Sequence, residues 1–131
     1  MSHHRETVTA DGAPEAVGPY SHAVKAGGLL FCSGQVPLDP ETGNLVGETA
    51  ADQARQCLRN LEAVASAGGA DLASDAARCT VYLTDMGDFA AVNEVYAEVF
   101  GESLPARVAI GVAALPKGAR VEIDAILVAG A

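Results

Sequence analysis

The spacing of apolar side chains predicts strands at the start of the chain. Residues 5–9 alternate weakly between polar and apolar, and residues 20–26 and 29–33 are two further strand-like segments. A Gly-Gly pair joins these two segments and tolerates the positive φ angles of a tight turn, so a β-hairpin is predicted. Residues 37–44 contain two prolines and a Gly-Asn pair, which suit an exposed loop.

The next segments have the three- and four-residue spacing of helices. Residues 49–67 place their apolar side chains on one face, and two glycines follow as a stop signal. Thr49, with Asp52 three residues later, gives an approximate capping box at the start. A second predicted helix is capped by Asp88 and ended by Gly101. One of its sides carries Phe89, Val92, Tyr96 and Val99.

Three more strands complete the pattern. Residues 76–84 alternate, and the side predicted to be buried carries Ala77, Cys79, Val81 and Leu83. Residues 107–114 and 120–129 are rich in Val and Ile, and the short stretch between them makes an antiparallel pair the simplest arrangement. The predicted fold class is therefore α+β, a mainly antiparallel or mixed sheet with two helices on one face.

The second face of this sheet is also predicted to be buried. Residues 29–32, 108–114 and 125–128 are nearly continuous apolar runs, as expected of strands that are covered on both sides. Two helices cover only one side, so another subunit is expected on the other. The alternative is an irregular loop that shields the apolar surface, since monomers seldom expose large apolar patches.

Composition narrows the class of protein. The 131 residues suit one domain spanning 1–131, and an apolar fraction of 50% suffices for a core. No apolar run approaches the roughly 20 residues of a membrane span, and the N-terminus lacks the apolar stretch of a signal peptide, so a soluble, cytoplasmic protein is expected. Cys32, Cys57 and Cys79 are widely spaced and are interpreted as reduced, semi-buried side chains.

Charge and motif searches argue against several function classes. With 17 acidic and 8 basic residues the formal charge is −9, which repels a phosphate backbone, so no nucleic acid partner is expected. The sequence has no nucleophile elbow, phosphate-binding glycine loop, dinucleotide fingerprint or helical metal-binding His pair. His3 and His4 lie in the N-terminal tail, and His22 is interpreted as a surface or packing residue, so no histidine is a candidate base.

Arg107 is the residue that stands out chemically. It begins an apolar strand, where a guanidinium is costly to bury without a partner. Glu122 or Asp124 on a neighbouring strand can supply a structural ion pair. Alternatively, Arg107 lies at the mouth of a cleft and presents its planar fork to a substrate carboxylate. The residues alone leave both interpretations open.

Five motifs between residues 18 and 128 resemble, in their order and spacing, the signatures of the RidA (YjgF-type, L-PSP) family. They are Gly18-Pro19-Tyr20-Ser21, Ser33-Gly34-Gln35-Val36-Pro37, Asn93-Glu94-Val95-Tyr96, Pro105-Ala106-Arg107 and Val121-Glu122-Ile123-Asp124-Ala125. The resemblance implies a chorismate-mutase-like α+β subunit and a homotrimer with a barrel-like centre and three clefts at the subunit interfaces. It also implies hydrolysis of reactive 2-imino acids, such as 2-iminobutanoate and 2-iminopropanoate, to 2-oxo acids and ammonia, without a metal or organic cofactor.

The resemblance also assigns roles to individual residues. Arg107 binds the substrate carboxylate and Glu122 positions the attacking water. The cleft is further lined by Tyr20, Ser33, Gly34, Asn93 and Ala109. The best-known members carry Cys at the position of Ala109. The family uses the backbone carbonyl there, and Ala supplies this group equally well. The departure leaves the subgroup and the preferred imine open.

Two other functions remain as alternatives. Members of the same family have been named endoribonucleases or translation inhibitors, but the acidic charge and the aromatic content of 5% argue against an RNA substrate. A non-catalytic, metabolite-binding trimer would use Arg107 only as an anchor. The presence of both Arg107 and Glu122 favours catalysis.

Overall fold

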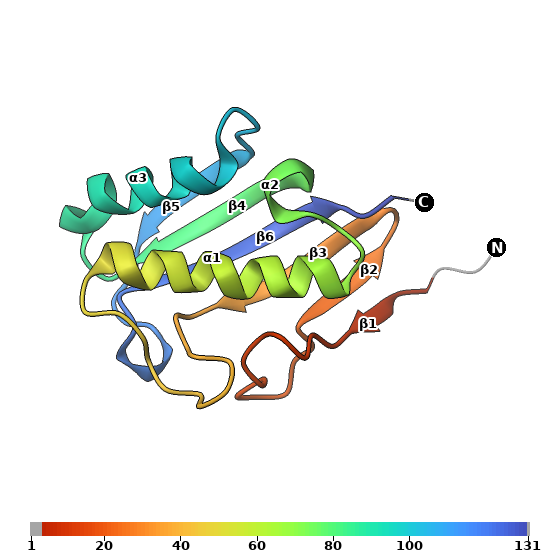
Figure 1. Cartoon of the computed structure of the whole chain (residues 1–131), viewed down its shortest axis with the longest axis horizontal. Helices are drawn as coiled ribbons and strands as arrows, with labels where there is room; N and C mark the ends of the chain where they lie inside the picture. Colours follow the sequence, from red (N-terminus) through yellow and green to blue (C-terminus); the bar gives the residue numbers. More distant parts are fainter. Residues whose placement is uncertain (1–3, 131) are drawn as a thin grey trace.

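The computed structural model describes residues 4–130 and contains one six-stranded mixed sheet with the long helices on one side (Figure 1). The strands are β1 (Glu6–Val8), β2 (Ala23–Ala26), β3 (Leu29–Gln35), β4 (Ala76–Leu83), β5 (Ala106–Gly111) and β6 (Val121–Val128). The helices are α1 (Ala50–Ala67), α2 (Leu72–Asp75) and α3 (Phe89–Phe100), with single-turn helices η1 (Met86–Asp88) and η2 (Pro116–Gly118). The strand order is β1-β2-β3-β6-β4-β5, and the predicted α+β class is confirmed.

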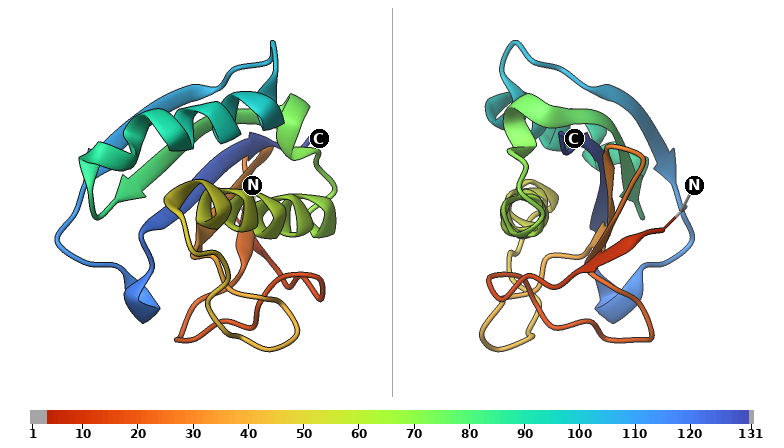
Figure 2. Two further views of the ribbon diagram at one scale, coloured as in Figure 1. Left: turned by 60° about the vertical axis from the view of Figure 1, so that its left-hand side comes forward. Right: turned by 90° about the vertical axis from the view of Figure 1, so that its right-hand side faces the viewer.

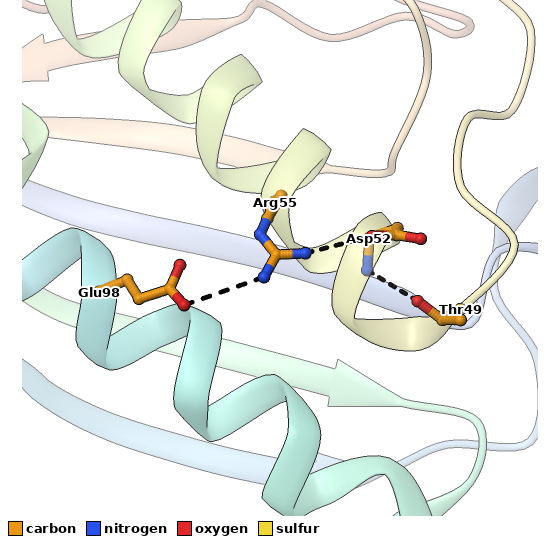
Figure 3. A network of polar contacts seen from close by, with 4 residues as sticks. All are labelled: Thr49, Asp52, Arg55 and Glu98. Atoms are coloured by element: carbon orange, nitrogen blue, oxygen red, sulfur yellow. Dashed lines mark hydrogen bonds and ion pairs between the residues drawn. The ribbon is translucent and has the colours of Figure 1, made fainter.

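Helix α1 begins and ends as the sequence predicts. The Thr49 hydroxyl accepts a hydrogen bond from the Asp52 amide at 3.1 Å, and Gly68 ends the helix. The Asp52 carboxylate accepts from Arg55 at 3.1 Å instead of completing the capping box. Figure 3 shows that Arg55 also faces Glu98 of α3, at 3.8 Å. This exposed network links the two long helices with little gain in stability.

The predicted cap of α3 is confirmed in position only, since Asp88 is the residue that precedes the helix. Asp88 makes no side-chain hydrogen bond to the first turn of that helix. The chain enters α3 through η1 instead, and Asp85 caps this turn by accepting a hydrogen bond from the Gly87 amide at 2.8 Å. Gly101, with a φ angle of 54°, ends α3 as predicted, because glycine adopts this backbone conformation without steric cost.

The sheet register corrects the predicted pairing of the last two strands. β5 pairs in parallel with β4, whereas β6 lies between β3 and β4 and is antiparallel to both. The reason is the crossover through α3, which returns the chain to the far side of β4 in the same direction. Residues 112–120 then cross the end of β4 to reach β6, so they do not form a hairpin.

A register shift within β4 moves one residue away from its predicted place. Ala77 lies between the pairs Ala76↔Leu127 and Arg78↔Ile126 as an extra residue, and its side chain is exposed. The rest of the predicted alternation is confirmed: the buried side chains of β4 are Cys79, Val81 and Leu83.

The hydrophobic core lies between the sheet and the long helices (Figure 2). The β6 side chains that point into it are Val121, Ile123, Ala125 and Leu127. All three cysteines are free, as predicted, and are more deeply buried than expected. None of the described helices combines the length and the apolar character needed to cross a membrane.

The other side of the sheet exposes large apolar side chains. We call this side the open face, and its exposed residues are Phe31 (42%), Val108 (38%), Ile110 (47%) and Val128 (52%). Because these side chains are accessible, residues 4–130 include no loop that shields them, and the shielding-loop alternative is wrong for this part of the chain. A covering subunit remains a prediction.

Candidate active site

Arg107 lies on the helix side of β5, the edge strand of the sheet. Its partner on β4 is Cys79, whose side chain is buried in the core, and paired residues on adjacent strands share a face. The guanidinium is exposed, and its Nη1 donates a hydrogen bond to Asn93 Oδ1 at 2.6 Å. Its carbon lies 5.4 Å from the ring centre of Phe89 and 4.9 Å from that of Tyr96.

The predicted ion pair between Arg107 and a strand carboxylate is wrong. Glu122 pairs with Tyr82 and alternates with buried core residues along β6, so its side chain is on the open face, as is that of Asp124. The sheet therefore separates both carboxylates from Arg107. Among residues 4–130, the ion pairs are those of Arg55 with Asp52 and Glu98. The carboxylate-anchor interpretation stays a prediction.

The guanidinium lines a surface hollow of about 390 Å³, which we call the arginine hollow. Its lining residues are Asn93, Tyr96, Ala97, Leu104, Pro105 and Arg107. One N–H group of Arg107 is used by Asn93, and the planar group carries further donors in a fixed fork. These remaining donors suit the two oxygens of a carboxylate.

Glu122 lines a second hollow of about 280 Å³, which we call the glutamate hollow. Its lining residues are Val17, Tyr20, Ser33, Gly34, Val36, Pro116 and Glu122. Glu122 packs directly on Gly34: a Cβ atom at Gly34 would overlap the carboxylate, lying 3.0 Å from its Cδ. Glycine is therefore required at position 34 for the Glu122 side chain to occupy this place.

Burial raises the pKa of Glu122 above its ordinary value, and the negative charge of Asp124 raises it further. Asp124 is held on the open face by two hydrogen bonds, from the Thr80 amide and from the Tyr82 hydroxyl, both at 2.9 Å. A carboxylate with a raised pKa is a stronger proton acceptor, which is the property that general base catalysis requires.

The other predicted cleft residues differ in how free their polar groups are. The Ser33 hydroxyl donates to the Ser21 carbonyl at 2.6 Å, so its oxygen keeps only acceptor capacity. The exposed Tyr20 hydroxyl accepts from the Val17 amide at 3.2 Å and keeps its proton for a ligand. Ala109 lines neither hollow: its side chain packs against the core on the helix side of β5.

The structure thus groups the predicted residues into two half-sites. Arg107 and Asn93 form one, and Glu122 forms the other with Gly34 and its neighbours. The contacts of Phe89 and Tyr96 with Arg107 were not predicted, although both rings were expected on one side of the predicted helix. With Asn93 they fall at the i, i+4 and i+7 positions that share a helix face, and this spacing was the available signal.

His22 has the structural role that the sequence predicted. Its ring is buried and bridges the N-terminal segment, with Nδ1 accepting from the Ala10 amide and Nε2 donating to the Pro14 carbonyl, both at 2.8 Å. Residues 4–130 contain no group of three or more His, Cys, Asp or Glu side chains placed to bind a metal ion. The tail residue His3 lies outside the described residues, and His4 is exposed.

Comparisons with known proteins identify the family. Residues 10–129 match the family described as Endoribonuclease L-PSP. A RutC family protein of Pyrococcus horikoshii is 52% identical over 122 residues, which are 93% of this chain and 96% of that protein. The 2-iminobutanoate/2-iminopropanoate deaminase of Mus musculus is 48% identical over 126 residues, 96% and 93% of the two chains. The crystal structure of RidA from the Antarctic bacterium Psychrobacter sp. has a TM-score of 0.89 and 47% identity, covering 94% of this chain and 98% of that chain. This chain therefore belongs to the RidA (YjgF, L-PSP) family, as its five motifs predicted.

Proposed function

We propose that the protein hydrolyses reactive 2-imino acids to 2-oxo acids and ammonia. The observation that carries the proposal is the state of Arg107: a fixed guanidinium with free donors, exposed in a hollow and paired with no carboxylate of residues 4–130. Such a group fits a ligand carboxylate, which every 2-imino acid has. The mouse relative is named for this activity.

In the proposed reaction, the free donors of Arg107 bind the substrate carboxylate and fix the orientation of the adjacent imine carbon. Glu122 accepts a proton from a water molecule while the water oxygen bonds to this electrophilic carbon. For an imine that is already protonated on nitrogen, this addition gives a carbinolamine, and the proton then passes from Glu122 to its amine nitrogen. The C–N bond breaks, ammonia leaves with the bonding electrons, and the hydroxyl proton returns to the Glu122 carboxylate as the carbonyl forms. Tyr20 and Ser33 contact the bound substrate, and Gly34 keeps the space in which Glu122 acts.

The two half-sites lie on opposite sides of one sheet, so we further propose that the cleft forms between subunits. In a homotrimer, the arginine hollow of one subunit would face the glutamate hollow of the next, giving three clefts around a barrel-like centre. The apolar open face supports this arrangement, because burial of such a surface against a second copy is favourable. The protein is expected to sediment at three times its 13.3 kDa subunit mass; a stable monomer would contradict the shared cleft.

A coupled assay tests the activity. An amino-acid dehydratase generates 2-iminobutanoate or 2-iminopropanoate in place, and release of the 2-oxo acid is compared with uncatalysed decay. The wild-type protein is expected to accelerate release, whereas Arg107→Ala and Glu122→Gln are expected to be inactive. Arg55→Ala is a matched control, since it removes an exposed arginine that lines neither hollow.

The assay also separates catalysis from binding. Tight binding of 2-oxobutanoate without any acceleration of imine hydrolysis would contradict the enzyme proposal and favour the metabolite-binding alternative. Glu122→Gln is expected to bind 2-oxobutanoate nearly as well as wild type, because the amide preserves the shape of the hollow. Wild-type turnover in that variant would remove Glu122 from the mechanism.

A further inference from the structure

We infer that Phe89 and Tyr96 are positioning residues for Arg107, whose guanidinium their aromatic rings hold in the orientation that a substrate carboxylate requires. The inference rests on the proposed function, since it takes Arg107 as the carboxylate anchor. It goes beyond that function because it assigns the orientation of the anchor to helix α3.

Three side chains of α3 contact the guanidinium from one face of the helix. Phe89, Asn93 and Tyr96 follow the i, i+4, i+7 spacing that places side chains in a row along a helix. Asn93 accepts from Nη1 at 2.6 Å, and the two ring centres lie 5.4 and 4.9 Å from the guanidinium carbon. Both distances are within the range of about 6 Å for cation–π attraction.

The Tyr96 ring is itself held firmly. It is buried in the core and stacks on Phe100 with a centroid distance of 4.6 Å and an interplanar angle of 47°. Its hydroxyl oxygen has no hydrogen-bond partner among residues 4–130. The contact with Arg107 therefore depends on the ring and not on the hydroxyl. A fixed ring behind an exposed guanidinium restricts the conformations of an otherwise flexible side chain.

This restriction has a consequence for affinity. An exposed arginine samples many rotamers, and the apparent dissociation constant of a ligand rises in inverse proportion to the fraction of molecules in the binding-competent conformation. One hydrogen bond to Asn93 fixes a single point of the group, and the contacts with the two rings restrict its remaining movement. Removing a ring lets the plane rotate, so carboxylate binding weakens while the chemistry at the imine carbon is unchanged.

The test compares ring-keeping with ring-removing substitutions. Tyr96→Leu removes the ring and is expected to raise KM and the dissociation constant of 2-oxobutanoate about tenfold, with kcat little changed. Tyr96→Phe keeps the ring and is expected to raise both constants clearly less than Tyr96→Leu does. Phe89→Leu and Phe89→Tyr form a second pair at a half-buried position, where the substitution is less disruptive to folding. Calorimetry measures the dissociation constant, and the coupled assay measures KM and kcat.

Val95→Ala is the matched control, because it opens a cavity under the same helix and leaves both rings in place. It is expected to lower the thermal midpoint without changing KM. The inference is overturned if the Leu variants retain the wild-type KM, or if Val95→Ala raises KM as much as they do. A wild-type protein that neither binds 2-oxobutanoate nor hydrolyses imine would overturn the proposed function and the inference together.

Discussion

If each cleft takes Arg107 from one subunit and Glu122 from the next, two inactive variants will restore one another's activity. Arg107→Ala removes the carboxylate anchor and Glu122→Gln removes the proton acceptor, so neither homotrimer contains an intact cleft. In a cyclic trimer that mixes the two variants in either proportion, one of the three clefts receives both native residues. Mixed trimers are therefore expected to reach about one third of the wild-type kcat per trimer, with a wild-type KM.

Two affinity tags and coexpression isolate the mixed trimers, and release of 2-oxobutanoate measures their activity. The matched control mixes wild-type subunits with an Arg107→Ala/Glu122→Gln double variant. The mixed trimers of this control contain either one or two wild-type subunits, and we take equal amounts of each. A cleft shared between subunits then leaves roughly one sixth of wild-type activity, whereas a cleft within one subunit leaves roughly one half. Inactive mixtures of the single variants, together with a half-active control, would refute the shared cleft.

Four further predictions follow from the two half-sites and the overall charge. Arg107→Lys keeps the charge but loses the planar fork, so kcat/KM should fall about 10- to 100-fold for each charge-assisted hydrogen bond lost. The free energy of unfolding in urea should change by less than about 1 kcal/mol, because the side chain is exposed and forms no ion pair within residues 4–130. A loss of about 3–5 kcal/mol would instead indicate a buried ion pair. The pKa of Glu122 is raised and its base form is the active one, so kcat/KM should decline with falling pH around a pKa above the ordinary value of about 4.3. Asp124→Asn removes a negative charge that raises this pKa, so it should move the decline to lower pH. Gly34→Ala should displace the Glu122 carboxylate and abolish turnover, while the free energy of unfolding in the same urea assay changes by less than about 1 kcal/mol, because the carboxylate is the end of a flexible side chain. Retained activity would contradict the packing argument. The acidic protein should show no salt-sensitive RNA binding in a filter assay near physiological ionic strength, whereas RNA cleavage that disappears in Arg107→Ala would favour the endoribonuclease alternative.

The elements that local sequence describes were predicted well. The cap of α1 at Thr49 and its end at Gly68 could be predicted because both depend on residues within one helical turn. The hairpin of β2 and β3 follows from two adjacent glycines with positive φ angles. Asp88 was predicted correctly as the residue before α3, but its side chain does not cap the helix. The chain enters α3 through the separate turn η1, which Asp85 caps.

Longer-range relations could not be predicted in the same way. The strand that pairs with β5 is determined by the crossover through α3. The pattern of polar and apolar residues along a strand does not encode this crossover. The face of Glu122 can be derived from its alternation with Val121 and Ile123, but β5 is apolar on both sides and gives no such alternation around Arg107. For this reason the sequence left both an ion pair and a ligand anchor open. The strand register excludes the ion pair with Glu122 or Asp124 within one chain, and the ligand anchor stays a prediction.

The same register explains how assembly and chemistry become linked in the proposed trimer. Along β5, Arg107 and Ala109 point to the helix side, and Val108 and Ile110 point to the open face. A second copy that buries Val108 and Ile110 must therefore approach the edge strand that carries Arg107. The glutamate hollow lies on this same open face of the sheet, so in the proposed trimer one apolar contact would bury the open face and bring the two half-sites together. An isolated subunit keeps Arg107 and Glu122 on opposite sides of the sheet, so under the proposed mechanism it would be inactive.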